Sequence, residues 1–175
     1  CPTIENPDQR DTDGDGIGDA CDPPSGALNF NEPYVSHNGP DDQEFIELVG
    51  TPGQSLNGVV ILHVDGDRNP INSLAPEAVL DLAVDLSGRV MPADGFFVAG
   101  NAGVPNVDLV IGTQDVLQDG TGTFYIVRSS APAALTALVG TSLDPEGDGV
   151  TSVPGLVTQI VETLALTDGG KIDRV

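Results

Sequence analysis

The sequence predicts an all-β fold, a β-sandwich, joined to a short calcium-binding segment that precedes it. Two observations favour the sandwich: short apolar runs recur along residues 27–175, and 22 glycines and 14 prolines are distributed throughout the chain. Frequent glycine and proline interrupt helical periods and are typical of the turns between strands. A third observation, a regular ladder of aspartates within residues 1–22, predicts the calcium-binding segment.

The predicted strands are runs rich in Val, Ile, Leu and Phe, bounded by Gly, Pro, Asn and Asp. No stretch keeps a helical period with proper caps, so the all-β sandwich is favoured over an α/β fold. The expected strands are Leu28–Asn31, Glu44–Val49, Val59–Val64, Val79–Leu86, Gly95–Ala99, Leu109–Ile111, Thr123–Val127, Leu135–Val139 and Leu156–Leu164.

Two of these strands allow a more detailed prediction. The run Val59–Leu62 is apolar at every position, which is typical of a central strand that is covered on both faces. In residues 44–49, Glu44 shares one face with two apolar residues, and Glu47 shares the opposite face with two others. Because neither face is cleanly apolar, we expect a bulge or an edge position there.

The aspartate ladder occupies residues 11–22. Acidic residues stand at loop positions one, three, five, nine and twelve, glycine stands at position six, and position seven offers a backbone carbonyl. Calcium takes about six to eight oxygen ligands, and glycine allows the sharp turn. Without a cation these carboxylates repel one another in a segment with almost no apolar material, so bound calcium is expected to give the segment its fold. The predicted ligands are the side chains of Asp11, Asp13, Asp15, Asp19 and Asp22 and the carbonyl of Ile17. The alternative is a solvated acidic linker without metal.

Further motifs flank the ladder: a Cys-Pro opening at Cys1, Asn-Pro-Asp-Gln at residues 6–9, and a closing Asp-x-Cys-Asp at residues 19–22. With the Asp-x-Asp-Gly-Asp-Gly core, they resemble one repeat of the thrombospondin type 3 family over residues 1–22. The resemblance implies an irregular repeat that wraps calcium ions and is cross-linked by disulfides. Position twelve is Asp22 where helix-loop-helix calcium sites usually have Glu, and prolines on both sides exclude the helices of such a site.

The two cysteines, Cys1 and Cys21, bracket the ladder. One disulfide between them is predicted, which contributes about 3 kcal/mol in the chain-entropy model and argues for an oxidising compartment. The alternative is a lipid-modified Cys1, as in a bacterial lipoprotein, which leaves Cys21 as a free thiol. Residues 23–26, Pro-Pro-Ser-Gly, form a short linker to the sandwich.

The chain carries 27 acidic and six basic residues, a formal net charge of −21. Nucleic acids and anionic membranes require a basic surface, so neither is expected as a partner, and no apolar run approaches the roughly 20 residues of a membrane span. Such acidity suits surroundings rich in calcium and salt, so we expect a secreted, extracellular or cell-surface location. No signal peptide is visible, and we expect a processed or excised chain, either a piece of a longer secreted protein or, as the alternative, a complete one.

A second set of motifs lies in residues 27–175, including a strand with glycine, two aromatic residues and valine. They resemble a lamin-tail domain of the bacterial secreted type, and this resemblance implies an immunoglobulin-like β-sandwich without catalytic residues of its own. Such domains ride on secreted or surface proteins, sometimes beside nucleases. The segments that carry the resemblance are residues 28–33, 41–48, 55–58, 95–101, 107–109, 117–120 and 164–175.

Groups suited to catalysis are sparse. His37 lies in a Ser-His-Asn-Gly-Pro loop, where a solvated turn residue is expected, and His63 lies in an apolar strand, where an edge or hydrogen-bonded histidine is expected rather than a ligand. The paired acids at residues 41–42 and 44–47 imitate an acid/base pair, but adjacent aspartates before a strand are usually turn formers. No nucleophile elbow, zinc-protease motif or phosphate-binding glycine loop is present. We therefore predict that the chain is not an enzyme.

Two other acidic loops repeat part of the ladder spacing. In residues 65–69, Arg68 adds a positive charge and Pro70 stands where the loop glycine belongs, so a hairpin loop is expected. Residues 144–149 are interpreted in the same way, with a weak surface calcium ion as the alternative in each.

These observations favour a non-enzymatic, extracellular, calcium-binding structural or adhesive protein, with assembly into a surface or filament subunit as one form of this hypothesis. The expected partners are calcium ions, other copies of the chain, or a cell-surface or matrix protein. The alternative is an accessory fragment of a larger secreted hydrolase, for example a nuclease, whose catalytic domain lies outside this chain.

Overall fold

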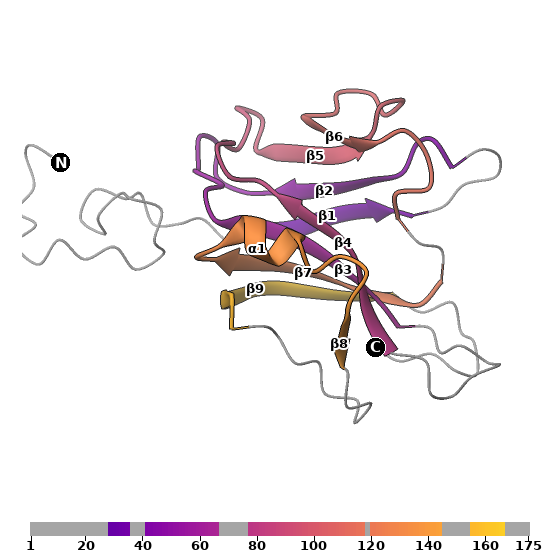
Figure 1. Ribbon diagram of the computed structural model, residues 1–175. Helices are drawn as coiled ribbons and strands as arrows, with labels where there is room; N and C mark the ends of the chain where they lie inside the picture. The colour runs from indigo at the N-terminus through magenta and orange to yellow at the C-terminus, as the bar shows by residue number, and fades with distance from the viewer. Residues whose placement is uncertain (1–27, 36–40, 67–76, 118–119, 145–154, 167–175) are drawn as a thin grey trace, which may run out of the picture.

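The structure is a computed structural model that describes residues 28–35, 41–66, 77–117, 120–144 and 155–166 (Figure 1). These residues form nine strands and one short helix, so the predicted all-β class is confirmed.

The strands lie in two sheets whose neighbouring strands are antiparallel, except for the parallel pair β5 and β6. The first sheet has four strands in the order β1 (Asn29–Tyr34), β2 (Phe45–Val49), β5 (Phe96–Asn101) and β6 (Leu109–Gly112). The second sheet has five strands in the order β8 (Ser142–Asp144), β4 (Glu77–Asp85), β3 (Val59–Asp65), β7 (Gly122–Ser129) and β9 (Val157–Leu166).

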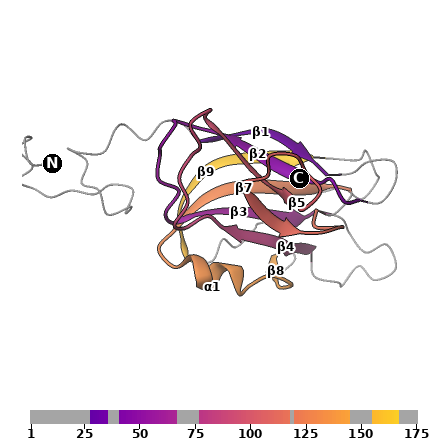
Figure 2. The ribbon, with the colours of Figure 1, turned by 90° about the horizontal axis from the view of Figure 1, so that it is seen from above.

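The main core lies between the two sheets, which form the layers of a sandwich (Figure 2). Alternate residues of each strand point into it, as the two-residue period of a strand requires. Ile46 of β2 and Ile61 of β3 are fully buried there, and so are the rings of Phe97 and Phe124. The ring of Phe30 meets Phe124 edge to face with their centroids 6.3 Å apart, which joins β1 to the second sheet.

A second apolar cluster covers the other face of β3. Val60 and Leu62 of β3 pack there with Leu135 of helix α1 (Pro132–Thr136) and Leu143 of β8. Strand β3 therefore lies between β4 and β7 with both of its faces buried, and the predicted central strand is confirmed. No helix in the described segments is long and apolar enough to cross a membrane.

Eight of the nine predicted strands are present, and the strand predicted at Leu135–Val139 is wrong. That run begins inside α1, where Pro132 is at the start of the helix and Leu135 is the one buried side chain. Proline is well suited to the first helical turn, and a helix of five residues is too short to display a period in the sequence. The three-residue strand β8 was not predicted, because its sequence, Ser-Leu-Asp, has a single apolar residue.

The prediction for residues 44–49 is half right. The edge position is wrong, because β2 lies between β1 and β5. The bulge is present in its pairing with β1, where the register shifts between Phe30 and Glu32. The face that contains Glu44 is the core face, and Glu44 itself is 1% exposed.

Candidate functional site

The predicted calcium ligands, Asp11, Asp13, Asp15, Ile17, Asp19 and Asp22, lie outside the described residues. The same is true of Cys1, Cys21 and His37, and of the loops at residues 67–69 and 145–149. The structure therefore leaves the calcium and disulfide predictions as predictions.

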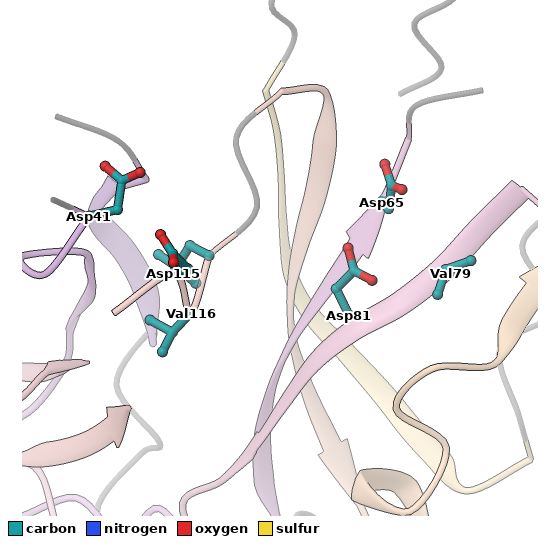
Figure 3. Close-up of a pocket in the computed structure, with 7 residues that line it drawn as sticks. Asp41, Asp65, Val79, Asp81, Asp115 and Val116 are labelled. Atoms are coloured by element: carbon teal, nitrogen blue, oxygen red, sulfur yellow. The ribbon is translucent and has the colours of Figure 1, made fainter. Parts of the chain in front are cut away.

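Within the described segments, the strongest candidate site is a cleft between the two sheets, which we call the acidic cleft (Figure 3). Its volume is about 560 Å³, and its lining consists of four carboxylates and three aliphatic side chains. One wall comes from loops of the first sheet and the other from strands β3 and β4. The lining residues are Asp41, Asp65, Val79, Asp81, Asp115, Val116 and Leu117.

A β-bulge places Asp81 in the cleft. On β4, Leu80 pairs with Val64 and Leu82 pairs with His63, so Asp81 is the extra residue between two adjacent positions of β3. Bulges of this kind redirect a side chain and recur beside functional sites. One carboxylate oxygen of Asp81, Oδ2, is buried without a hydrogen-bond partner. Burial, together with the nearby charge of Asp65, raises the pKa of Asp81 to about 6.

The opposite wall is held by hydrogen bonds to the residues that precede β2. The backbone N–H of Asp115 donates to the carbonyl oxygen of Asp41 at 2.8 Å, and the Asn101 side chain donates to the same oxygen at 3.2 Å. Asp115 has a φ of +50°, a left-handed conformation that aspartate tolerates better than most residues. These bonds bring Asp41 and Asp115 to the same wall, although 74 positions separate them in the sequence.

Behind this wall lies the buried carboxylate of Glu44. Its Oε2 accepts hydrogen bonds from the backbone N–H groups of Val116, at 2.6 Å, and Leu117, at 3.3 Å. Burial raises the pKa of Glu44, the two N–H donors oppose that rise, and the charges of Asp41 and Asp115 add to it. Glu44 thus ties the segment after β6 to the start of β2.

Of the two acid pairs that imitate a catalytic pair, the fold separates Glu44 from Glu47. Glu44 points into the core, whereas Glu47 lies on the outer face of the first sheet, where its Oε1 accepts a hydrogen bond from Asn31 at 2.5 Å. Asp41 lines the acidic cleft with Asp115, which is far away in the sequence. Sequence reasoning missed this partnership because no local pattern links the two loops.

His63 does not lie at a sheet edge, and its ring nitrogens are not both hydrogen-bonded. It lies on the internal strand β3, is 2% exposed, and has no partner for Nδ1. Its ring stacks on Phe124 with centroids 4.3 Å apart and an interplanar angle of 16°. Burial lowers its pKa to about 4, and the nearby charge of Asp65 opposes this effect.

The chemistry of the acidic cleft follows from its lining. Four carboxylates attract cations, and the raised pKa of Asp81 allows it to exchange a proton under mildly acidic conditions. Across the described segments, however, no group of three or more His, Cys, Asp or Glu side chains is arranged to hold a metal ion. The cleft is thus a cation-attracting and proton-exchanging surface.

Comparison with known proteins adds no further constraint: no protein-family model and no curated protein sequence matches this chain.

Proposed function

We propose that this chain is an extracellular, calcium-binding structural or adhesive protein without catalytic activity of its own. The single observation that carries the proposal is the aspartate ladder of residues 11–22, with its glycine at the sixth position. In this proposal residues 1–22 form a thrombospondin type 3-like repeat that is wrapped around calcium. The sandwich of residues 27–175 is an immunoglobulin-like, lamin-tail-like module that the repeat joins to the rest of an assembly.

The distribution of polar groups on the sandwich supports a binding role over a catalytic one. The acidic cleft is lined by carboxylates and aliphatic side chains, and the described histidine, His63, is stacked in the core. A cleft of this kind suits a cation or a basic side chain of a partner, since its charges attract positive groups from a distance.

For assembly with other copies, β6 is the described edge strand best suited to strand addition. It is apolar along Leu109–Gly112, and the side chain of Val110 is 52% exposed. Strand β6 carries one register shift in its pairing with β5, whereas β9 carries two in its pairing with β7, and each such bulge discourages pairing at a sheet edge. We propose that any contact between copies uses β6.

Calorimetric titration with calcium tests the proposal directly. The chain should bind calcium with a dissociation constant of about 10⁻³ M or tighter, the range of extracellular modules. The double variant Asp13→Asn/Asp15→Asn should lose this binding, since it removes two predicted ligand charges.

A matched control is Asp85→Asn/Asp94→Asn, which removes the same charge from the sandwich. Each of these aspartates accepts a backbone hydrogen bond two residues ahead, at 2.8 Å for Asp85 and 3.1 Å for Asp94, and asparagine keeps that acceptor. The control should bind calcium like the wild type. Equal binding by both double variants would refute the ladder as the calcium site.

A further inference from the structure

Two fully buried acceptor oxygens on neighbouring strands lack a hydrogen-bond donor. They are Oε1 of Glu44, a residue that is 1% exposed, and Oδ1 of Asn101, a residue that is 0% exposed. Buried acceptors are nearly always paired in native proteins, so two of them at one place call for a shared explanation.

The register of β2 and β5 places these side chains next to each other. Phe45 pairs with Gly100 and Ile46 pairs with Ala99, so the next position brings Glu44 opposite Asn101. The backbone N–H of Asn101 donates to the carbonyl oxygen of Glu44 at 2.9 Å, which confirms that the pairing continues. Both residues are in phase with Ile46 and Ala99 on the core face, and directly opposed residues have Cβ atoms about 4.5–5.5 Å apart.

The remaining polar atoms of both side chains are already committed. The Oε2 atom of Glu44 accepts from Val116 and Leu117, and Nδ2 of Asn101 donates to the carbonyl oxygen of Asp41. That last bond fixes which way the Asn101 amide points, because turning it over would set Oδ1 against another acceptor. The two unpaired atoms are therefore both acceptors, and neither side chain can turn to offer a donor.

We propose that Glu44 carries a proton on Oε1 and donates it to Oδ1 of Asn101. One proton taken up from solvent converts the carboxylate to the neutral acid and satisfies both oxygens, while Oε2 keeps its two backbone donors. The surroundings favour this form. Burial raises the pKa of Glu44, and the charged groups of the loops that pack on it, Asp41 and Asp115, are both acidic.

Among the described residues, the groups that face the wall from the second sheet bring no positive charge that would oppose the proton. Asp65 of β3 and Asp81 of β4 are acidic, and His63 is neutral at physiological pH because its pKa is lowered to about 4. The proton therefore stabilises the packing of residues 115–117 against the start of β2. Because these residues belong to one wall of the acidic cleft, the proton also holds that wall in place. Loss of the proton leaves a buried anion beside an unpaired acceptor and loosens this wall.

The test compares the wild type with Glu44→Gln by thermal unfolding between about pH 5 and pH 8, in the presence of a chelator. Glutamine is the neutral mimic, since its NH₂ group donates to Asn101 and its oxygen accepts from Val116 and Leu117. A group whose pKa is raised by folding stabilises the protein at low pH and loses that contribution as the pH rises. The Tm of Glu44→Gln should therefore equal that of the wild type at low pH and exceed it at high pH.

An ionised Glu44 gives the opposite sign: the wild type would then be the more stable protein at high pH, and this result would overturn the proposal. Glu47→Gln in the adjoining strand β2 is the matched control, because it makes the same substitution on the outer face of the sheet, and its Tm difference from the wild type should not change with pH in the same way. Infrared spectroscopy of the wild type supplies a second readout that does not depend on a variant. The spectrum should show the carbonyl stretch of one protonated carboxyl group at neutral pH, and the absence of this band would refute the proposal.

A cation is the competing occupant of the two oxygens. Calcium added to the Asp13→Asn/Asp15→Asn background, in which the N-terminal ladder is disabled, separates this outcome from the proposed function. We expect Glu44→Gln to leave the calcium response of Tm there unchanged. A calcium-dependent rise in Tm that Glu44→Gln abolishes would replace the proton by a metal ion.

Discussion

Protonation of His63 is expected to cause an acid-linked loss of stability in the sandwich. This histidine is buried on an internal strand, its ring stacks on Phe124, and its Nδ1 has no partner. Burial lowers its pKa from 6.5 to about 4, which outweighs the opposite effect of Asp65. Folding therefore opposes protonation of this side chain.

The size of the effect follows from the two pKa values. The difference between 6.5 and about 4 corresponds to about 3 kcal/mol in the free energy of unfolding, which is an upper value for this single group. Because the folded pKa is the lower one, the unfolded chain binds more protons between these values. The contribution of His63 is thus fully present above pH 6.5 and is lost as the pH falls towards 4.

In the wild type, the titration of Asp81 offsets the loss of stability that protonation of His63 causes. The pKa of Asp81 is raised from 3.8 to about 6, so its contribution has the opposite sign: it is present at low pH and is lost as the pH rises through 6. The two groups thus oppose each other over nearly the same interval. Replacing Asp81 by Asn removes the opposing term and exposes the effect of His63.

Urea unfolding at pH 7, 5.5 and 4 measures the result. Asp81→Asn should lose about 3 kcal/mol more than the double variant Asp81→Asn/His63→Leu over this range, because all other groups titrate alike in both proteins. Parallel pH profiles of the single and double variants would refute the assignment of a buried, neutral histidine at this position.

Two predictions concern packing and need only Tm or urea measurements at neutral pH. A Cβ at Gly122 would lie 2.2 Å from Nε2 of His63, so Gly122→Ala should destabilise the fold by about 1–3 kcal/mol, whereas Gly155→Ala, which meets no atom within 4 Å, should change little. Leu48→Ala should cost about 2–5 kcal/mol because it leaves a cavity between the sheets, while Val110→Ala, at a position that is 52% exposed on the same sheet, should cost much less. Similar losses for either pair would mean that these residues do not pack as described.

The strands were predictable from the sequence to the extent that each one carries its own pattern. Val59–Leu62 is apolar at every position because β3 has an apolar layer on both faces, and the predicted central strand follows from that fact alone. The five-residue helix α1 was not predicted, because it is too short to show a helical period in the sequence. The run that contains Leu135 has the composition of a strand, yet the proline three residues before it starts a helix.

The predicted site and the observed cleft lie in different parts of the chain. The aspartate ladder is a local pattern of twelve consecutive residues, and it lies outside the described segments. The four carboxylates of the acidic cleft come from two loops and two strands, so no spacing within a short stretch of sequence predicts the cleft. The acids at positions 81 and 85 interrupt the predicted β4, and Asp81 is the one that the bulge turns into the cleft.

The sequence by itself determined the all-β class, the central strand and the strongly acidic character of this protein, because residue type and periodicity act over a few neighbouring positions. Only the tertiary structure decided that Glu44 is buried opposite Asn101, and that Asp41 and Asp115 share one wall. The physical reason is that burial and strand register are set by contacts between segments that are distant in the chain. A carboxyl group such as that of Glu44 is buried in one strand register and would be exposed to solvent in another.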